Sequence, residues 1–343
     1  MEGIDIHYST QLSKNNDDLM ILDLPEDLLQ EIESGKILSI KGQLSDEAII
    51  CGSSSSYILR SSETSNALML VNNGTIEKEA HSILTCEKII PPLHQVLTLL
   101  EESPYTFNDQ KKTNVYSFEE IVEKAQASPK EIKDYLEKIS SFEWEGCQRI
   151  FDEEFRVEAL KNVLYLVMKY DWETVSVMDV ATANEFRGIP HQIVEALLST
   201  IGNVSTYWEP DFLKVYQVGV MDLFLQNPEY YANEFGEAYS KLLEILIPRR
   251  MITNFPLSQI LQGIAINRVS NSKLTIRYLP AAKLSYNFQD RLNLLFSIKD
   301  KWTEEEIGIY LHDVLTMPLP KALLKYTKRI SENSQVMFMN KLN

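Results

Sequence analysis

Four basic side chains near the C-terminus recur at the spacing of one helical face, at i, i+4, i+7 and i+8 of a helix predicted over residues 319–330. They are Lys321, Lys325, Lys328 and Arg329. Cations on one exposed face neutralise phosphates, the contact that supplies most of the affinity for nucleic acid. The pattern predicts weakly sequence-specific DNA binding, to which Lys341 can add. The alternative interpretation is an ordinary solvated helix face.

The other side chains that could take part in catalysis or bind a metal form no recognisable catalytic or metal-binding pattern. Gly35–Lys36 has no upstream glycine, so it does not make a phosphate-binding loop. The carboxylates of residues 304–306 fit the first turn of a helix, where the helix dipole stabilises negative charge. The five histidines lack metal-ligand spacing to one another or to a cysteine, and Cys147 has no neighbouring base. We expect a protein that is not an enzyme and needs no cofactor or metal.

The basic helix is the third of three predicted helices. Residues 291–311 read as one helix, a turn and a second helix, which begins at Glu304 because Thr303 and Glu306 form a capping box. Pro318 and Pro320 open the third helix, and residues 334–339 follow as a strand. This order predicts a winged-helix unit. Trp302 is best interpreted as a packing anchor between the helices, with a partner-binding hot spot as the alternative.

Similar helical periodicity occurs upstream, which predicts an arm of three to four tandem winged-helix domains. We expect one unit over residues 91–155, one or two over 154–286, and a C-terminal, DNA-binding unit over 287–343. The predicted third helices of the first two units carry mixed charge or no basic residue. They are therefore interpreted as structural or protein-binding copies.

Residues 1–90 form a different segment, with short apolar runs separated by Gly, Ser and Asn clusters. We predict a small β-barrel or sandwich here and hence an α+β chain. Several runs lack polar alternation, as do strands that are covered on both faces. Either a partner completes the barrel or the barrel is self-contained. The predicted partner-binding residues are Tyr57, Leu59, Leu68 and Leu70.

Charge supports the same division of the chain. The 343 residues carry a formal charge of -16, yet residues 287–343 hold 8 Lys and Arg against 7 Asp and Glu, a net +1 that leaves -17 for the rest. Nucleic acid repels an acidic surface, so DNA contact is expected only from the last unit. Three widely spaced cysteines indicate no disulfide framework and favour a reducing compartment. We expect an intracellular protein without a membrane span.

Three stretches resemble the defective-in-sister-chromatid-cohesion family. Residues 289–307 with 323–327 resemble its C-terminal domain, 48–52 with 63–70 resemble its pair of strands around a Thr-Ser-Asn turn, and 103–105 match the start of its helical part. Members of this family are accessory subunits of an alternative, cohesion-type replication factor C clamp loader. The family is usually described with three winged helices.

The resemblance implies a hetero-oligomer in the nucleus. The β segment would form a joint barrel with the small cohesion subunit and the C-terminal tail of the large ATPase subunit, and through them contact the small replication factor C subunits. The arm would engage single- and double-stranded DNA and the catalytic subunit of DNA polymerase epsilon, a contact that we assign to the first unit and the barrel. PCNA would be reached indirectly. Two other functions remain open: a winged-helix regulator of transcription or chromatin, and a scaffold that binds only protein.

Overall fold

The computed structural model describes residues 7–8, 20–44, 46–107, 114–171, 174–247, 254–270, 273–315, 317–332 and 335–341. The chain divides into two compact units. The first comprises Met1–Gln95 and Val122–Asp134, and the second comprises Val96–Ile121 and Tyr135–Asn343. The predicted α+β class is confirmed. Among the described helices, none combines the length and apolar character that crossing a membrane requires.

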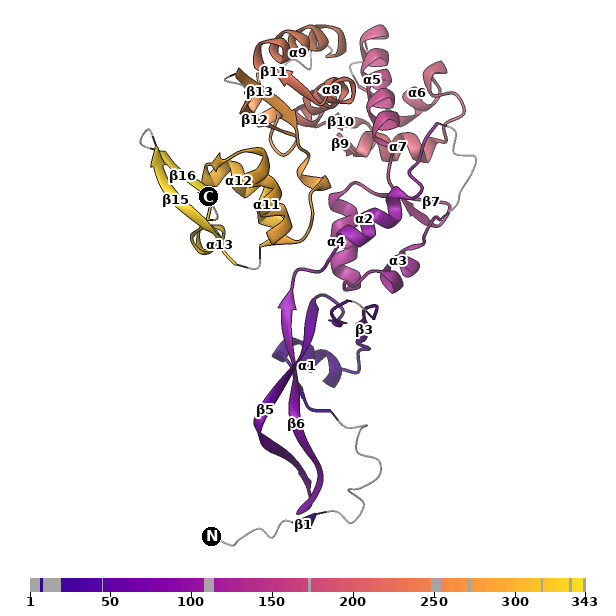
Figure 1. The fold of residues 1–343 in the computed structure, drawn as a ribbon. Coiled ribbons are helices and arrows are strands. Elements are labelled where there is room, and N and C mark those ends of the chain that lie inside the picture. Colours follow the sequence, from indigo (N-terminus) through magenta and orange to yellow (C-terminus); the bar gives the residue numbers. More distant parts are fainter. Residues whose placement is uncertain are drawn as a thin grey trace. The chain divides into compact units, whose positions relative to one another are not determined.

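The first unit is built on one long hairpin (Figure 1). Its elements are β1 (His7–Tyr8), β2 (Leu22–Asp23), α1 (Glu26–Glu33), β3 (Ser39–Lys41), β4 (Ile49–Cys51), β5 (Ser56–Asn72) and β6 (Thr75–Ile89). The strand order is β1-β6-β5-β4-β3, with β2 also on β6. The described strands thus form an open sheet, not a closed barrel. The self-contained barrel considered from sequence is not formed.

Local chemistry explains the hairpin. Asn73 and Gly74, with φ angles of 50° and 80°, connect β5 to β6, as the two positive φ angles of a tight hairpin turn require. The apolar runs around Tyr57 and Leu70 were expected as separate strands, but they belong to the single strand β5. A register shift between Glu63 and Leu68 lets the intervening residues bulge while pairing with β6 continues.

A small core joins α1 to the sheet. Leu28, Ile50, Tyr57 and Cys86 are its buried members. The Tyr57 hydroxyl donates a hydrogen bond to Asp27 on α1, and this bond is the main reason that the pKa of Asp27 lies below its usual value. Tyr57 is only 2% exposed, so it belongs to the core of the unit and not to its surface.

Lys41 connects the sheet to the segment 122–134 of the same unit. Its ammonium group donates hydrogen bonds to the carbonyl oxygens of Val122, Ala125 and Ala127, the last two at 3.0 Å each. These carbonyls lie in the last turn of the helix α3 (Phe118–Lys124) or directly after it, where backbone acceptors have no partner within the helix. Burial lowers the pKa of Lys41, and the three carbonyl contacts replace the water that the charged group loses.

Replacing Lys41 with methionine is expected to destabilise the first unit by about 2–3 kcal/mol, because three buried carbonyl groups lose a charged donor. The free energy of unfolding from urea titration and the hydrogen exchange of amides in residues 125–128 would measure the change. Lys130→Met, at an exposed position of the same unit, is the matched control. If Lys41→Met lowers the free energy of unfolding no more than Lys130→Met does, the hydrogen bonds of Lys41 contribute little to stability.

Downstream of Ile89, one order of elements occurs four times in the described residues: helix, strand or bridge, two helices, then a hairpin. We name these segments repeat 1 (94–149), repeat 2 (153–210), repeat 3 (212–278) and repeat 4 (288–340). The helices are α2 (His94–Glu101), α3 (Phe118–Lys124), α4 (Pro129–Lys138), α5 (Glu153–Lys169), α6 (Val177–Ala181), α7 (His191–Ser199), α8 (Phe212–Gln226), α9 (Ala232–Leu246), α10 (Leu257–Ile260), α11 (Phe288–Ile298), α12 (Glu304–Leu311) and α13 (Leu319–Tyr326). The strands are β7 (Phe142–Trp144), β8 (Cys147–Arg149), β9 (Gly202–Val204), β10 (Trp208–Pro210), β11 (Glu229–Tyr231), β12 (Ala265–Ser270), β13 (Lys273–Tyr278), β14 (Lys301–Trp302), β15 (Thr327–Glu332) and β16 (Gln335–Asn340).

The four repeats also share one strand pairing. In repeats 3 and 4 the strand after the first helix pairs antiparallel with the last strand of the hairpin, β11 with β13 and β14 with β16. In repeats 1 and 2 a single bridge takes that place, Tyr116 with Gln148 and Val175 with Trp208. In repeat 4 the sequence predicted the last strand, β16, but assigned most of β15 to the preceding helix. It did not predict β6.

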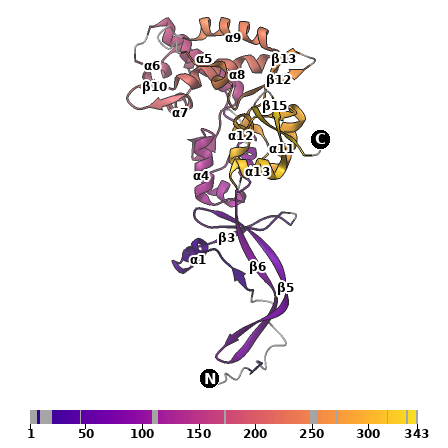
Figure 2. The same cartoon turned by 90° about the vertical axis from the view of Figure 1, so that its left-hand side faces the viewer.

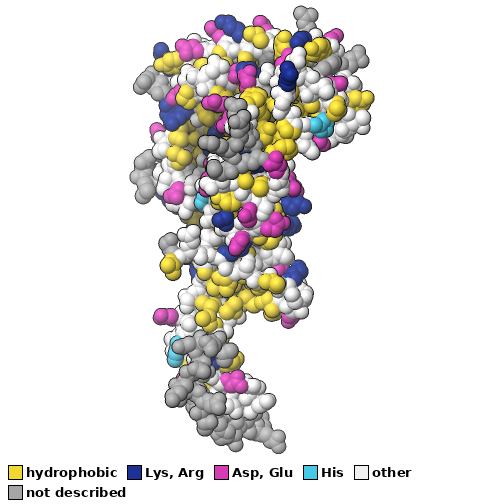
Figure 3. All heavy atoms as spheres, turned by 90° about the vertical axis from the view of Figure 1, so that its right-hand side faces the viewer, with side chains coloured by type: hydrophobic (Ala, Val, Ile, Leu, Met, Phe, Trp, Pro, Cys, Tyr) yellow, Lys and Arg dark blue, Asp and Glu magenta, His cyan; other side chains and the backbone are white. Residues whose placement is uncertain are grey.

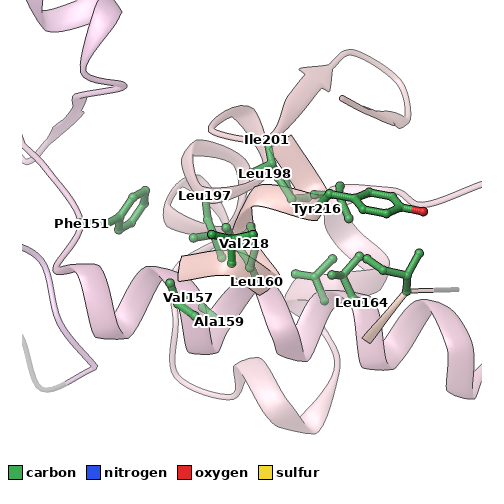
Figure 4. Close-up of a cluster of buried hydrophobic side chains, with 14 of the residues drawn as sticks. Phe151, Val157, Ala159, Leu160, Leu164, Leu197, Leu198, Ile201, Tyr216 and Val218 are labelled. Carbon is green, nitrogen blue, oxygen red and sulfur yellow. The ribbon is translucent and has the colours of Figure 1, made fainter. Parts of the chain in front are cut away.

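Two clusters of buried side chains hold the second unit together. The larger one centres on α5, α7 and α8, and Figure 4 shows Leu197 and Leu198 of α7 facing the Leu160 side of α5. The smaller one lies mainly in repeat 4, between α11, α12, α13 and β16, and it also includes Ile266 of β12 and Leu279 and Leu284 of the chain that follows β13. Figures 1 and 2 show these three helices beside the β15–β16 hairpin. Trp302 is 1% exposed in this cluster, which confirms its interpretation as a packing anchor.

Candidate interaction surfaces

The four basic residues predicted on one helix are divided between a helix and a strand. Helix α13 ends at Tyr326, and residues 327–332 form β15. Lys321 and Lys325 are on the helix, whereas Lys328 and Arg329 are on the strand, so the prediction of one continuous basic helix face is wrong. The Thr327 hydroxyl donates to the Leu323 carbonyl at 2.5 Å and closes the helix, and pairing with β16 extends the chain from there.

Three lysines remain together. Lys321 and Lys325 share one face of α13 at i, i+4, and the Lys341 ammonium donates to the Lys325 carbonyl. We call Lys321, Lys325 and Lys341 the α13 lysine cluster. Lys328 and Arg329 are consecutive on β15, so their side chains leave opposite faces of the hairpin. All five are exposed, and within the described residues none of them forms an ion pair with a carboxylate.

The third helices of the other repeats differ in charge. Helix α4 carries three lysines and three acids, α7 has no lysine or arginine, and α10 is the four-residue segment Leu-Ser-Gln-Ile. Helix α13 has two lysines and no acid. Among these four helices, only α13 presents unopposed positive charge, so the sequence-based distinction between the repeats holds for the described residues.

A buried arginine network positions the helices beneath α13. Arg291 of α11 is fully buried, and its Nη1 donates to the Tyr310 carbonyl at 2.7 Å and to Asp313 at 2.6 Å. Its Nε donates to the Ser285 carbonyl at 2.5 Å, and its Nη2 to the Leu284 carbonyl at 3.2 Å. One side chain therefore joins α11 to the end of α12 and to the chain that precedes α11.

The first unit presents an apolar surface. Its exposed large hydrophobic side chains are Met20, Leu22, Leu29, Ile32, Ile37, Ile40, Leu44, Met69, Leu70 and Val71. Ile37 is 93% exposed and Ile40 64% exposed, values typical of unfolded chains or of surfaces that bind a partner. Figure 3 shows hydrophobic side chains gathered in its lower third, where this unit lies.

The predicted partner-binding residues occupy unlike positions in this unit. Leu70 is 43% exposed, Leu59 and Leu68 are partly buried, and Tyr57 is a core residue. The pairing of β5 with β4 covers residues 56–58, and the Leu59 amide still donates to the Ala48 carbonyl at 2.8 Å, so among the described residues β5 has an open edge from Arg60 to Asn72. A two-stranded ribbon is marginally stable alone in water, and its unpaired edge is a template for another strand.

The remaining candidates have structural roles. Glu304–Glu306 form the first turn of α12, where the Thr303–Glu306 capping box is present as predicted. Gly35 has a φ of 77° in the turn after α1. Within the described residues, no three His, Cys, Asp or Glu side chains are arranged to hold a metal ion.

Comparison with known proteins gives one consistent result. The family model described as sister chromatid cohesion protein Dcc1 matches residues 19–311. The sister chromatid cohesion protein DCC1 of Xenopus laevis is 24% identical to this chain, over 97% of the chain and 91% of that protein. The protein of the same name from Homo sapiens is 26% identical over 92% and 86%. A probable sister chromatid cohesion protein DCC1 of Dictyostelium discoideum is 30% identical over 43% and 41%.

Proposed function

Because the chain belongs to the family of sister chromatid cohesion protein Dcc1, we propose that it supports sister chromatid cohesion as a non-catalytic subunit of an alternative replication factor C clamp loader. In this proposal it acts in the nucleus, where the complex loads or unloads PCNA at replication forks and partner subunits hydrolyse the nucleotide. The observation that carries the assembly role is the open sheet of the first unit, with its exposed apolar side chains.

The open sheet suits completion by other chains. An edge strand from Arg60 to Asn72 offers backbone donors and acceptors, and the neighbouring apolar side chains offer area that is favourable to remove from water. We propose that the small cohesion subunit and the C-terminal tail of the large ATPase subunit add strands here and complete a joint barrel. The small replication factor C subunits would be bound through these two partners.

The second part of the proposal concerns the arm. We infer that repeats 1 to 4 are winged helices, supported by their common order of elements and by the pairing of the second element with the last strand. Repeat 4 would contact single- and double-stranded DNA through the α13 lysine cluster. Repeat 1 and the sheet would engage the catalytic subunit of DNA polymerase epsilon. Several modest contacts on one chain raise the effective concentration of the loader at the fork.

A second candidate function has its own support. Three of the four third helices lack unopposed positive charge, as expected for winged helices that bind protein alone. A protein-binding scaffold would then use the same apolar sheet but would show no salt-dependent affinity for DNA. The DNA-binding experiment described in the Discussion separates the two functions.

Introducing charge on the apolar surface is expected to break the assembly. The double variant Ile40→Lys/Leu70→Lys should lower recovery of replication factor C subunits with the tagged full chain by about tenfold or more, because a lysine buried without a partner costs several kcal/mol. Affinity purification from nuclear extract followed by mass spectrometry measures the recovery. Both positions are exposed, so the fold of the free chain should be kept, which thermal unfolding checks.

The control adds the same charge to the same strands. Ser39→Lys/Ser65→Lys changes two exposed polar positions on β3 and β5 and should leave recovery unchanged. If the unmodified chain recovers no replication factor C subunit, the clamp-loader proposal fails. If the double variant recovers as many replication factor C subunits as the control variant does, the assembly surface lies elsewhere.

A further inference from the structure

The hairpin of repeat 3 differs in charge from the hairpins of the two repeats before it (Figure 1). Residues 265–278, which contain β12 and β13, carry three cations, Arg268, Lys273 and Arg277, and no acid. The hairpin at 142–149 has two glutamates and the buried Arg149, and the hairpin at 202–210 has one glutamate and no cation. In a chain with a formal charge of -16, residues 265–278 are a local excess of positive charge.

Strand register places the three cations on one face of the sheet β11-β13-β12. Lys273 and Arg277 are four residues apart on β13, so both leave the same face as Thr275. Arg268 of β12 lies opposite Thr275 and shares that face. Glu229 of β11 lies opposite Arg277 and is the one acid among the described residues of this sheet. The face therefore keeps a positive formal charge.

The acid on this face positions one of the cations. Glu229 accepts hydrogen bonds from Nε and Nη2 of Arg268, at 3.0 Å each, and from the Thr275 hydroxyl at 2.8 Å. Burial alone would raise the pKa of Glu229, but these donors hold it below its usual value. The fork uses only part of the N–H groups of the guanidinium, so Arg268 can donate to a further acceptor while its plane is held in place.

The outer end of the hairpin combines charge with apolar side chains. Lys273 is exposed, and its ammonium nitrogen lies 4.9 Å from the centroid of the Tyr231 ring. Val269 and Leu274 lie opposite each other in the register and are 74% and 51% exposed. Cations next to exposed apolar side chains suit the backbone of a nucleic acid, which presents phosphates beside the less polar sugars.

A groove of about 490 Å³ connects this hairpin to repeat 4. Arg268 and Val269 of β12 contribute to its lining, and the rest comes from residues 298–301 and from the β15–β16 hairpin. The hairpins of repeats 3 and 4 therefore border one groove. A ligand long enough to follow it would contact both repeats, so the positive face of repeat 3 is continuous with the repeat that carries the α13 lysine cluster.

We propose that the β12–β13 hairpin of repeat 3 binds the phosphate backbone of duplex DNA, as a second contact beside that of repeat 4. Arg268, Lys273 and Arg277 pair with phosphates, and Val269 and Leu274 pack against sugars. The inference rests on the proposed DNA contact of repeat 4 and extends it to a repeat whose third helix, α10, has no charge.

The arrangement of the cations selects the ligand. They are spread along one sheet face and do not converge on a point, so a polyanion fits better than a small anion. A duplex fits better than a single strand, because unpaired bases bind by stacking on aromatic rings. The exposed ring on this face, Tyr231, is already covered on one side by Lys273.

Removing two of the three charges tests the contact on the full chain. Lys273→Gln/Arg277→Gln leaves the Arg268–Glu229 pair in place. Fluorescence anisotropy at about 50 mM NaCl should show roughly tenfold weaker binding of a 30-base-pair duplex, and the slope of log K against log salt should decrease by about 2, since each phosphate contact contributes close to one unit. Lys214→Gln/Lys241→Gln, at exposed positions on helices of the same repeat, is the control and should change neither quantity.

Hydrogen exchange locates the contact without any substitution. Addition of the duplex should slow the amides of residues 265–270 and 273–278 by about threefold or more, whereas those of the acidic hairpin at 202–210 should not change. A single strand of the same length should slow the first set less, and poly-glutamate should not slow it. If thermal unfolding shows that Lys273→Gln/Arg277→Gln does not fold, this measurement decides.

Either of two results would overturn the proposal: a charge variant that matches its control in affinity and salt slope, or hairpin amides that the duplex leaves unchanged. Equal slowing by poly-glutamate would assign the hairpin to an acidic protein segment, and equal slowing by the single strand would assign it to unpaired DNA. If the unmodified chain binds no duplex, the proposed DNA contact of repeat 4 fails as well. If it binds through the α13 lysine cluster alone, only this inference fails.

Discussion

Replacing Arg291 with alanine should lower the stability of repeat 4 by about 3–5 kcal/mol, the usual cost of breaking a fully buried charged network. Among the described residues, the change leaves Asp313 paired with Lys138 alone, at 3.7 Å, and it removes the donor from three backbone carbonyls. Residues of α11, which pack on Trp302 and Tyr310, should then exchange their amide hydrogens faster. Native-state hydrogen exchange is the suitable measurement, because a chain of several repeats need not unfold in one step.

Arg329→Ala provides the comparison, since it removes the same side chain from an exposed position of the same repeat. Its effect should stay within about 0.5 kcal/mol. Arg291→Lys should recover only part of the loss, because an ammonium group cannot reproduce the fork of donors that reaches both sides of the network. Protection of α11 that is equal in Arg291→Ala and Arg329→Ala would show that the network contributes little.

Removing the α13 lysine cluster should weaken DNA binding roughly 10- to 100-fold at low salt and reduce the slope of log K against log salt by about 2–3, since each lost phosphate contact removes close to one unit. The variant is Lys321→Ala/Lys325→Ala/Lys341→Ala. Fluorescence anisotropy with a 30-base-pair duplex and a 30-nucleotide single strand, from about 50 to 200 mM NaCl, covers the range where counterion release is measurable. Two duplexes of unrelated sequence should bind the chain with similar affinity, because phosphate contacts carry no sequence information.

A charge-matched control replaces three exposed lysines of the other repeats, Lys133→Ala/Lys214→Ala/Lys241→Ala. Its affinity and salt slope should match those of the unmodified chain. A separate variant, Lys328→Ala/Arg329→Ala, asks whether the β15 hairpin adds phosphate contacts of its own. If the control loses as much affinity as the cluster variant, binding reflects diffuse charge, and the protein-binding scaffold becomes the better description.

Much of the helical fold was predictable because its signals are local. The capping boxes at Ser117–Glu120, Ser128–Glu131 and Thr303–Glu306 all form, and each marks the start of a helix. A capping residue acts on amides within three positions, so the sequence alone contains the relevant information. The tight turns that connect hairpin strands, such as Asn73–Gly74, likewise depend on neighbouring residues only.

The errors occurred where pairing with another segment of the chain decided the structure. The apolar spacing of residues 319–330 suits a helix, but pairing of β15 with β16 ends that helix at Tyr326 and separates Lys328 and Arg329 from Lys325. The strand β6 mixes charged, polar and apolar residues without regular alternation or a long apolar run, so only its pairing with β5 reveals it. Arg291 did have a signal, since it falls four residues before the buried Leu295, on the apolar face of α11. The carbonyl acceptors of Lys41 lie more than 80 residues away in sequence, at Val122, Ala125 and Ala127.

The return of residues 122–134 to the first unit has a consequence for how the gene can change. Repeat 4 is one continuous stretch that contains most of its own buried cluster, so a duplication or deletion could add or remove it nearly whole, whereas repeats 2 and 3 share the larger cluster and would have to change together. Repeat 1 cannot be exchanged in this way, because its middle portion is part of the compact unit that contains the sheet. A recombination that replaced repeat 1 would also remove the carbonyl groups that hold Lys41, and the sheet would have to be rebuilt at the same time.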